Sequence, residues 1–229
     1  MKLRKNASIE TRMRIVIDPM TPVDILVQLS QDENWRVRLG VAENPNTPTE
    51  VLARLSQDKH WEVRREIARN PRTPAEVLVR LSRDIKQYSL FQEIARNPNT
   101  PVEVLVRLSR DESIWVRYYV ARNPMTPIEV LVQLSQDWSS DVRRGVAENP
   151  NTPIEVLVRL SQDEYWMVLK RVAWNPNTPI EVLVRLSQDE YTRIEVAENP
   201  KWSEPANQER IKELKKLLDL EEELGIELF

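Results

Sequence analysis

The feature that most constrains this chain is a Thr-Pro pair that recurs through most of its length. In the 229-residue sequence, successive pairs are separated by steps of 26, 26, 27, 26, 26 and 26 residues; they begin at Thr21, Thr47, Thr73, Thr100, Thr126, Thr152 and Thr178. A fixed period in this range is typical of a solenoid, in which each unit buries its apolar side only against its neighbours. The sequence therefore predicts one elongated array of stacked units.

Each unit is predicted to hold two short helices. The first begins at the Thr-Pro pair, and the second follows an aspartate and ends at Asn-Pro, where proline stops it. We expect the threonine hydroxyl to cap the first helix, the aspartate to cap the second, and the asparagine to act as a helix end. Only three glycines are present and strand signals are missing. The predicted fold is an all-α solenoid of about seven 26-residue repeats.

The array is expected to have a cap at each end. Residues 1–18 read as an N-terminal half-repeat, residues 19–200 as the repeats, and residues 201–229 as a C-terminal capping helix. That helix is predicted over 204–224, with Ile211, Leu214, Leu217, Leu218 and Leu224 on its apolar side. Covering the last repeat is the simpler interpretation, and a dimerisation helix is the alternative because it would use the same apolar side.

Composition removes several classes of function. The net charge of −3 argues against a protein built mainly to coat nucleic acid, which would be basic. There is no cysteine and only one histidine, so we expect no metal site, no cofactor and no catalytic residues. No apolar run suits a signal peptide or a membrane span, so a soluble cytoplasmic protein without membrane partners is expected.

The repeat motif resembles a known family. The pattern Val-Arg-x-x-Val-Ala-x-Asn-Pro-Asn-Thr-Pro-x-Glu-Val-Leu-x-Arg-Leu-Ser, over roughly residues 11–200, is similar to the leucine-rich variant (LRV) repeat, a relative of HEAT-type helical repeats. The resemblance implies a right-handed superhelix of short helices, some of them 3₁₀. One member of that family carries a cysteine-rich iron–sulfur segment ahead of its repeats; because this chain has no cysteine, we expect no iron–sulfur cluster.

Two recurring side chains have a structural interpretation. An arginine lies in one register of the second helix, at Arg38, Arg64, Arg117, Arg143 and Arg193. We expect each to pair with the aspartate of the preceding turn in a ladder between repeats, because a buried arginine needs a partner. The series Trp35, Trp61, Tyr88 and Trp166 is interpreted as packing between repeats.

The exposed side of the second helices is the predicted partner-binding surface, because its residues do not follow the repeat. Exposed Trp, Tyr and Arg together are typical of interface hot spots. In HEAT-like arrays the second helix lines the concave face, so these side chains are expected to face a ligand. The candidate residues are Arg69, Arg96, Trp115, Tyr118, Tyr119, Arg122, Arg144, Lys170, Arg171 and Trp174.

Three functions fit this surface. The favoured one is a non-catalytic scaffold that binds a protein or peptide. The alternative is nucleic-acid binding along the Arg69, Arg96 and Arg122 strip, with bases stacked on aromatic side chains. A designed or purely structural repeat protein without a ligand is the third, because design also produces near-identical units.

Overall fold

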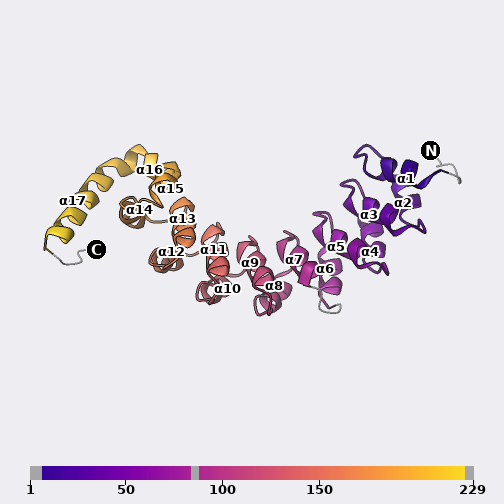
Figure 1. Ribbon diagram of the computed structural model, residues 1–229, viewed down its shortest axis with the longest axis horizontal. Coiled ribbons are helices and arrows are strands. Elements are labelled where there is room, and N and C mark those ends of the chain that lie inside the picture. Colours follow the sequence, from indigo (N-terminus) through magenta and orange to yellow (C-terminus); the bar gives the residue numbers. More distant parts are fainter. Residues whose placement is uncertain (1–6, 84–87, 225–229) are drawn as a thin grey trace. The chain divides into compact units, whose positions relative to one another are not determined.

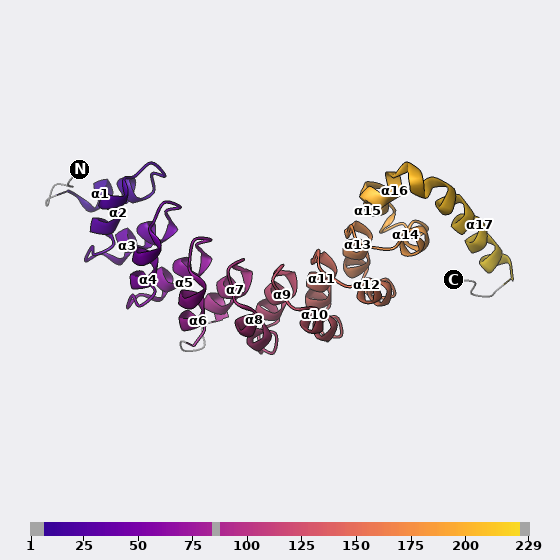
Figure 2. The same ribbon diagram turned by 180° about the vertical axis from the view of Figure 1, so that it is seen from behind.

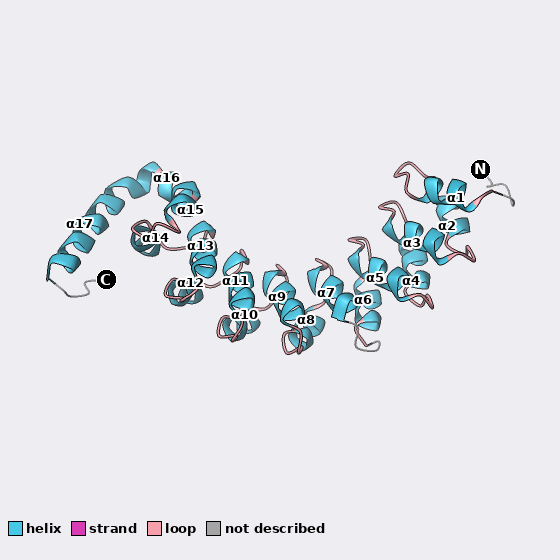
Figure 3. Cartoon of the chain, in the orientation of Figure 1, coloured by secondary structure: helices cyan, strands magenta, loops and turns pink. Residues whose placement is uncertain are grey.

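The structure is a computed structural model that describes residues 7–83 and 88–224. Every regular element in these residues is a helix (Figure 3), which confirms the predicted all-α solenoid. The chain divides into two compact units, Met1–Val116 and Arg117–Phe229, with the boundary inside α9. Part of the irregular third repeat, including Asp84, lies outside the described residues.

The first unit is built from short helices that alternate between the two types predicted. They are α1 (Ile9–Val16), α2 (Val23–Leu29), α3 (Trp35–Glu43), α4 (Thr49–Leu55), α5 (Trp61–Arg69), α6 (Ala75–Leu81), α7 (Tyr88–Arg96), α8 (Val102–Leu108) and the start of α9 (Ile114–Arg122). The buried positions of each pair form one apolar layer, for example Val37 and Val41 of α3 with Leu52 of α4. Because these helices have only seven to nine residues, packing between layers must hold them.

The second unit continues this pattern and ends in a longer helix. Its elements after α9 are α10 (Ile128–Leu134), α11 (Ser140–Glu148), α12 (Ile154–Leu160), α13 (Trp166–Trp174), α14 (Ile180–Leu186), α15 (Arg193–Glu198), α16 (Pro200–Ser203), a 3₁₀ turn (Pro205–Asn207) and α17 (Gln208–Leu224). In Figures 1 and 2, α10, α12 and α14 form one row, and α11 and α13 form the other. The second helices of successive repeats therefore lie side by side and share one face.

The threonine of each Thr-Pro pair points into the core. The Thr47 hydroxyl is fully buried and donates to the carbonyl oxygen of Val41 at 2.5 Å, and no side chain caps α4. The predicted threonine cap is therefore wrong. The Val41 carbonyl, in the last turn of the preceding helix, accepts the Asn44 amide at 3.2 Å, and the hydroxyl gives it a second, shorter bond.

Among the described residues, the aspartates before the second helices close a turn and do not cap the helix. The Oδ1 atom of Asp58 accepts from the His60 amide at 2.9 Å, and α5 begins only at Trp61. The same bond, from the aspartate to the amide two residues later, recurs at Asp32, Asp111, Asp137, Asp163 and Asp189. The aspartates therefore set the entry of the chain into the second helix.

The asparagine that ends the second helix, directly before a proline, links its repeat to the preceding repeat. The Nδ2 atom of Asn149 donates to the carbonyls of Ala121 at 2.6 Å and Asn123 at 2.8 Å, and its Oδ1 accepts from the Asn151 amide at 2.8 Å. Matching bonds to the preceding repeat are made by Asn44, Asn70, Asn97, Asn175 and Asn199. These side chains form an asparagine ladder, which the interpretation as helix ends did not include.

An arginine–aspartate ladder connects the repeats as predicted, but its pairing differs. The Arg38 guanidinium forms two hydrogen bonds, of 2.5 and 2.9 Å, with the carboxylate of Asp58, which belongs to the next repeat. Arg38 contacts the aspartate that precedes it, Asp32, only by donating to its backbone carbonyl oxygen. Arg117–Asp137 and Arg143–Asp163 repeat the same pairing. The extended side chain reaches forward because its carboxylate partner is held in place by the turn described above.

The second unit ends where α17 packs on α14. Val184 of α14 is fully buried in a cluster with Ile211, Leu214 and Leu218 of α17. These three are among the five apolar positions predicted for the C-terminal helix; Leu217 is only partly buried, and the side chain of Leu224 is not among those described. The regular helix begins at Gln208, after a 3₁₀ turn, which is later than the predicted start at residue 204.

Candidate functional site

The two candidate arginines of the first unit are paired within their own helices. Arg69 lies 3.6 Å from Glu66, and Arg96 lies 3.8 Å from Glu93. Trp115, also in this unit, is 48% exposed at the start of α9. The first unit thus presents an exposed aromatic side chain, but its arginine charges are partly neutralised by glutamates one turn earlier.

A cavity of about 330 Å³ in the first unit brings two carboxylates together. Its lining includes Glu43, Glu66 and Arg69. Partial burial, and then the charge of Glu66, raise the pKa of Glu43, while Arg69 and Arg65 act in the opposite direction. Because the arginines here balance the glutamates, this surface is poorly suited to a phosphate backbone.

Four candidate residues of the second unit meet around one carboxylate. Glu148 of α11 accepts Arg122 from α9 at 2.6 Å and Arg171 from α13 at 3.1 Å, and Arg144 of its own helix lies 3.8 Å away. The Tyr118 hydroxyl is 3.3 Å from the same carboxylate. We call Tyr118, Arg122, Arg144, Glu148 and Arg171 the Glu148 cluster. Three neighbouring second helices are joined by it.

Tyr118 is not an exposed contact residue, which corrects the prediction. Its side chain is 7% exposed, and the guanidinium groups of Arg122 and Arg144 lie 5.5 and 5.2 Å from the centre of its ring. Tyr119 is only partly exposed, and the two rings are 5.2 Å apart. The ring of Tyr118 therefore supports the arginines above it, an arrangement that stabilises cations over an aromatic face.

Gly145 makes room for this tyrosine. Gly145 of α11 is buried, and a Cβ there would lie 2.9 Å from both Tyr118 Cδ2 and the Tyr118 carbonyl oxygen. Because one of these atoms belongs to the backbone, the contact cannot be relieved by a rotamer change.

Gly145→Ala is therefore expected to destabilise the second unit by about 1–2 kcal/mol, since overpacking outweighs the gain of roughly 1 kcal/mol in helix propensity. Chemical denaturation followed by circular dichroism measures this change. A matched Ser140→Ala substitution in the first turn of α11 should change stability by less than about 0.5 kcal/mol. A gain of stability in Gly145→Ala would contradict the close approach of α9 and α11.

An open cavity lies beside the Glu148 cluster, along one face of α13. Its volume is about 260 Å³, and it is lined by Arg144, Trp166, Met167, Lys170, Arg171 and Glu195. Lys170 pairs with Glu195 at 2.8 Å and lies 5.2 Å from the centre of the Trp166 ring. Met167, Lys170, Arg171 and Trp174 are spaced i, i+3, i+4 and i+7, so they share one side of the helix. We call these four residues with Trp166 the α13 face.

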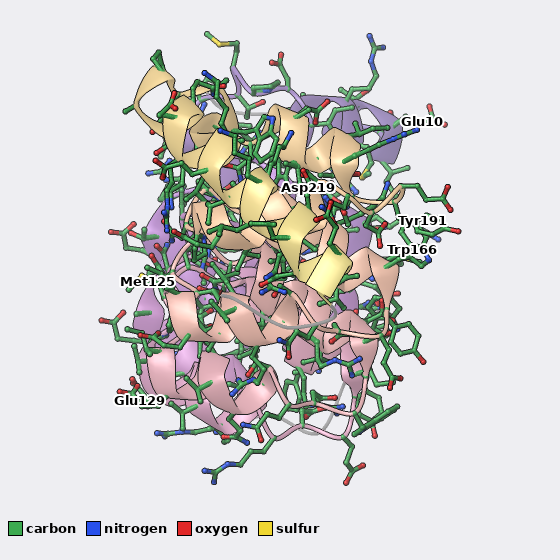
Figure 4. The ribbon with its side chains drawn as sticks, turned by 90° about the vertical axis from the view of Figure 1, so that its left-hand side faces the viewer. Glu10, Met125, Glu129, Trp166, Tyr191 and Asp219 are labelled. Carbon is green, nitrogen blue, oxygen red and sulfur yellow. The ribbon has the colours of Figure 1, made fainter. Side chains whose placement is uncertain are left out.

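The large side chains of the α13 face are about half exposed. The exposed fractions are 45% for Trp166, 46% for Met167 and 51% for Trp174. The ring of Tyr191 lies 6.2 Å from that of Trp166, and Figure 4 shows the two side by side at one edge of the molecule. The aromatic series was interpreted as packing between repeats. Trp35, stacked on His60 at 3.9 Å, and Trp166, beside Tyr191, both contact the following repeat, but Trp166 also keeps nearly half of its surface exposed.

The charges of this region nearly cancel. Four cations, Arg122, Arg144, Lys170 and Arg171, contact three carboxylates, those of Asp141, Glu148 and Glu195. These four candidate cations, of which Arg122 belongs to the predicted strip, thus form a network of ion pairs with a small net positive charge. Such a network orients side chains for a partner with mixed polarity more readily than it attracts a polyanion.

Two site residues were missed by the sequence reasoning. Glu195 lies on α15, where the repeat loses two residues and the register is hard to follow, and Tyr191 stands at the end of the loop before that helix. Glu148 was noted only as a flanking charge. Its signal was available, because three arginines surround it at neighbouring registers of the repeat.

The described residues offer no group of three or more His, Cys, Asp or Glu side chains arranged to hold a metal ion. Within the same residues, no helix has the length and apolar character needed to cross a membrane.

Comparisons with known proteins identify the repeat. The family model described as "Leucine rich repeat variant" matches residues 35–60, 61–84 and 141–164. These units are leucine-rich variant repeats. A solved structure titled "a leucine-rich repeat variant with a novel repetitive protein structural motif" is 29% identical, with a TM-score of 0.54 over 82% of this chain and 80% of that one. An engineered protein is 20% identical, with a TM-score of 0.43 over 82% of this chain and 72% of its own. No curated protein matches the chain.

The site residues occupy registers whose identity changes from one repeat to the next. Tyr118, Arg144 and Lys170 share one register of the second helix, and Tyr119, Gly145 and Arg171 share the following one. The buried valines, asparagines and threonines of the same repeats hardly change. The framework of the leucine-rich variant repeat thus holds the second helices in place, while these two registers determine the chemistry of their shared face.

Proposed function

We propose that the chain is a non-catalytic scaffold that binds a protein or peptide through the α13 face. The observation that supports this most directly is the exposure of Trp166, Met167 and Trp174 beside an open cavity. Large aromatic and methionine side chains contribute much contact area for little loss of rotamer freedom, and they are enriched at interface centres. Ion pairs fix the surrounding arginines, which lowers the entropic cost of binding.

The chemistry of the α13 face favours a peptide with both an apolar anchor and a carboxylate. The cavity would accept an apolar side chain between Trp166 and Met167, and Lys170 and Arg171 at its edge would pair with an acidic group. A nucleic acid is the weaker candidate, because Glu148 and Glu195 already neutralise much of the positive charge that a phosphate backbone requires.

The proposal predicts a selective loss of binding when the aromatic anchor is removed. Peptides selected from a random phage-displayed library against the full chain should lose at least about tenfold in affinity for Trp174→Ala, since that ring would be buried in the complex. Trp138→Ala is the matched control, because Trp138 is 75% exposed on the loop before α11 and away from the α13 face. Isothermal titration calorimetry measures both affinities.

Two outcomes would contradict the proposal. In one, no peptide is enriched, or the enriched peptides bind Trp174→Ala and the parent chain equally. In the other, labelled single-stranded DNA or RNA binds at physiological salt, and its affinity falls steeply with added salt and in Arg171→Ala. The second result would establish the nucleic-acid function instead. Thermal melts of each variant show whether a loss of binding reflects unfolding.

A further inference from the structure

The C-terminal helix α17 covers one side of α14 with a specific set of contacts. Val184 is fully buried against Ile211, Leu214 and Leu218, and Ile180 packs at the edge of this cluster. Two ion pairs flank the apolar row, Arg210 with Glu181 and Arg185 with Glu221, each at 3.6 Å. Figure 1 shows α17 running alongside α14 at the end of the second unit. The surface of α14 thus binds an amphipathic helix within the same chain.

The same receptor surface occurs a second time, uncovered, on α12. The sequences of α12 and α14 are identical, Ile-Glu-Val-Leu-Val-Arg-Leu. The four α14 residues that contact α17 correspond to Ile154, Glu155, Val158 and Arg159, and all four are exposed. Val158 is 42% exposed and Ile154 is 54% exposed, whereas Val184 at the matching position is 0% exposed. On α14, α17 contacts the same combination, an apolar pair (Ile180 and Val184) with a glutamate and an arginine beside it.

The neighbourhood of α12 extends this surface. A cavity of about 320 Å³ has Val158 of α12 on one side, and on the other Val182 of α14 with Glu181 and Arg185, the two residues that pair with α17. The preceding helix α10 is less complete, because Gln133 replaces the arginine that completes the second ion pair. Within the second unit, α12 is therefore the uncovered helix that keeps all four contact residues of α14.

We propose that Ile154, Glu155, Val158 and Arg159 form a docking site for an amphipathic helix of a separate protein. The contacts of α17 define the chemistry of that helix. It carries aliphatic residues at i, i+3 and i+7, an arginine one position before them and a glutamate three positions after them, as in the segment Arg210 to Glu221. Two such charges placed on opposite ends fix the direction in which the helix lies. This site is separate from the α13 face and does not depend on the function proposed for it.

A peptide of residues 203–224 tests the proposal directly. Labelled with fluorescein and titrated with the full chain, it should bind saturably, because the chain's own α17 occupies α14 and leaves α12 open. Val158→Asp should weaken binding by at least about tenfold, since a carboxylate would replace the central apolar contact. The control is Val27→Asp, which places the same substitution at the same helix position of α2 in the first unit. It should change affinity by less than about twofold.

A charge exchange locates the bound helix. Glu155→Arg should weaken the peptide several-fold, and a peptide carrying Arg210→Glu should regain that loss on the Glu155→Arg chain but not on the parent chain. Three results would overturn the proposal. The first is no binding of the peptide. The second is binding lost in Glu181→Arg and kept in Glu155→Arg, which would mean exchange with the chain's own α17. The third is self-association of the chain that Val158→Asp abolishes in sedimentation, which would make a second copy the occupant.

Discussion

Asn149→Asp is expected to lower the stability of the second unit strongly. The side chain is fully buried, and its Nδ2 donates to the carbonyls of Ala121 and Asn123. Replacing this nitrogen with an oxygen removes two hydrogen bonds and places an anion against two carbonyl oxygens. We expect a loss of about 4 kcal/mol, because each unsatisfied buried group costs roughly 1–3 kcal/mol and the charge adds to it. The melting temperature should fall by about 10 °C.

The pH dependence of this variant provides an internal check. Burial and the facing carbonyls would raise the pKa of the introduced carboxyl in the folded state. A raised pKa in the folded state means that the destabilisation is smallest at low pH and grows as the pH rises. Asn151→Asp is the control, because Asn151 is exposed and contributes one bond, to the Pro124 carbonyl at 2.8 Å. Equal shifts for the two variants would show that the asparagine ladder does not hold the repeats together.

The repeat period predicts the fold because every unit must solve the same packing problem. Prolines at fixed spacing mark the ends of the helices, and the apolar positions between them place Val37, Leu52 and their equivalents in the core. Predictions from local sequence were incomplete where a polar side chain forms its hydrogen bonds with a neighbouring helix or repeat. Thr47 was expected to cap its own helix but donates to a carbonyl of the preceding helix. Asn149 does end α11, as expected, but its side chain also donates to carbonyls of the preceding repeat, which was not foreseen. Such bonds leave no trace in the local sequence.

The candidate site was predicted in part for a similar reason. Side chains that vary between repeats identify an exposed helix face, and Trp174 and Arg171 are exposed as expected. Helical spacing alone does not separate the exposed side from the side that contacts the next repeat. Tyr118 was therefore placed in solvent, although it packs against the position of Gly145. Ion pairs between adjacent repeats, such as Arg122 with Glu148, form only if the two helices approach closely enough. The sequence of a single repeat does not give the distance between helices of neighbouring repeats.

Asp58→Asn is expected to destabilise the first unit by about 3 kcal/mol. The carboxylate receives both the Nε and Nη2 atoms of Arg38, and the two side chains are 9% and 6% exposed. Removing its charge leaves a buried guanidinium without a counterion, which costs about 3–5 kcal/mol in pairs of this kind. Arg38→Leu should cost less than half as much, because Asp58 would keep its bond from the His60 amide. The chain itself has this arrangement in the second unit, where Leu169 occupies the arginine register. Urea unfolding of both variants tests the asymmetry.

The effect of Asp58→Asn should disappear in acid. Burial raises the pKa of Asp58, but the hydrogen bonds from Arg38 and from the His60 amide lower it more, so the folded-state pKa lies below the usual value of 3.8. A carboxyl with a depressed folded-state pKa stabilises the protein above its unfolded pKa, and this contribution is lost as the pH falls through the folded-state value. The difference between parent and variant should therefore be constant from about pH 5 to pH 8 and shrink below about pH 4. A difference that persists unchanged at pH 2.5 would mean that Asn at this position distorts the turn before α5, and that the ion pair contributes little.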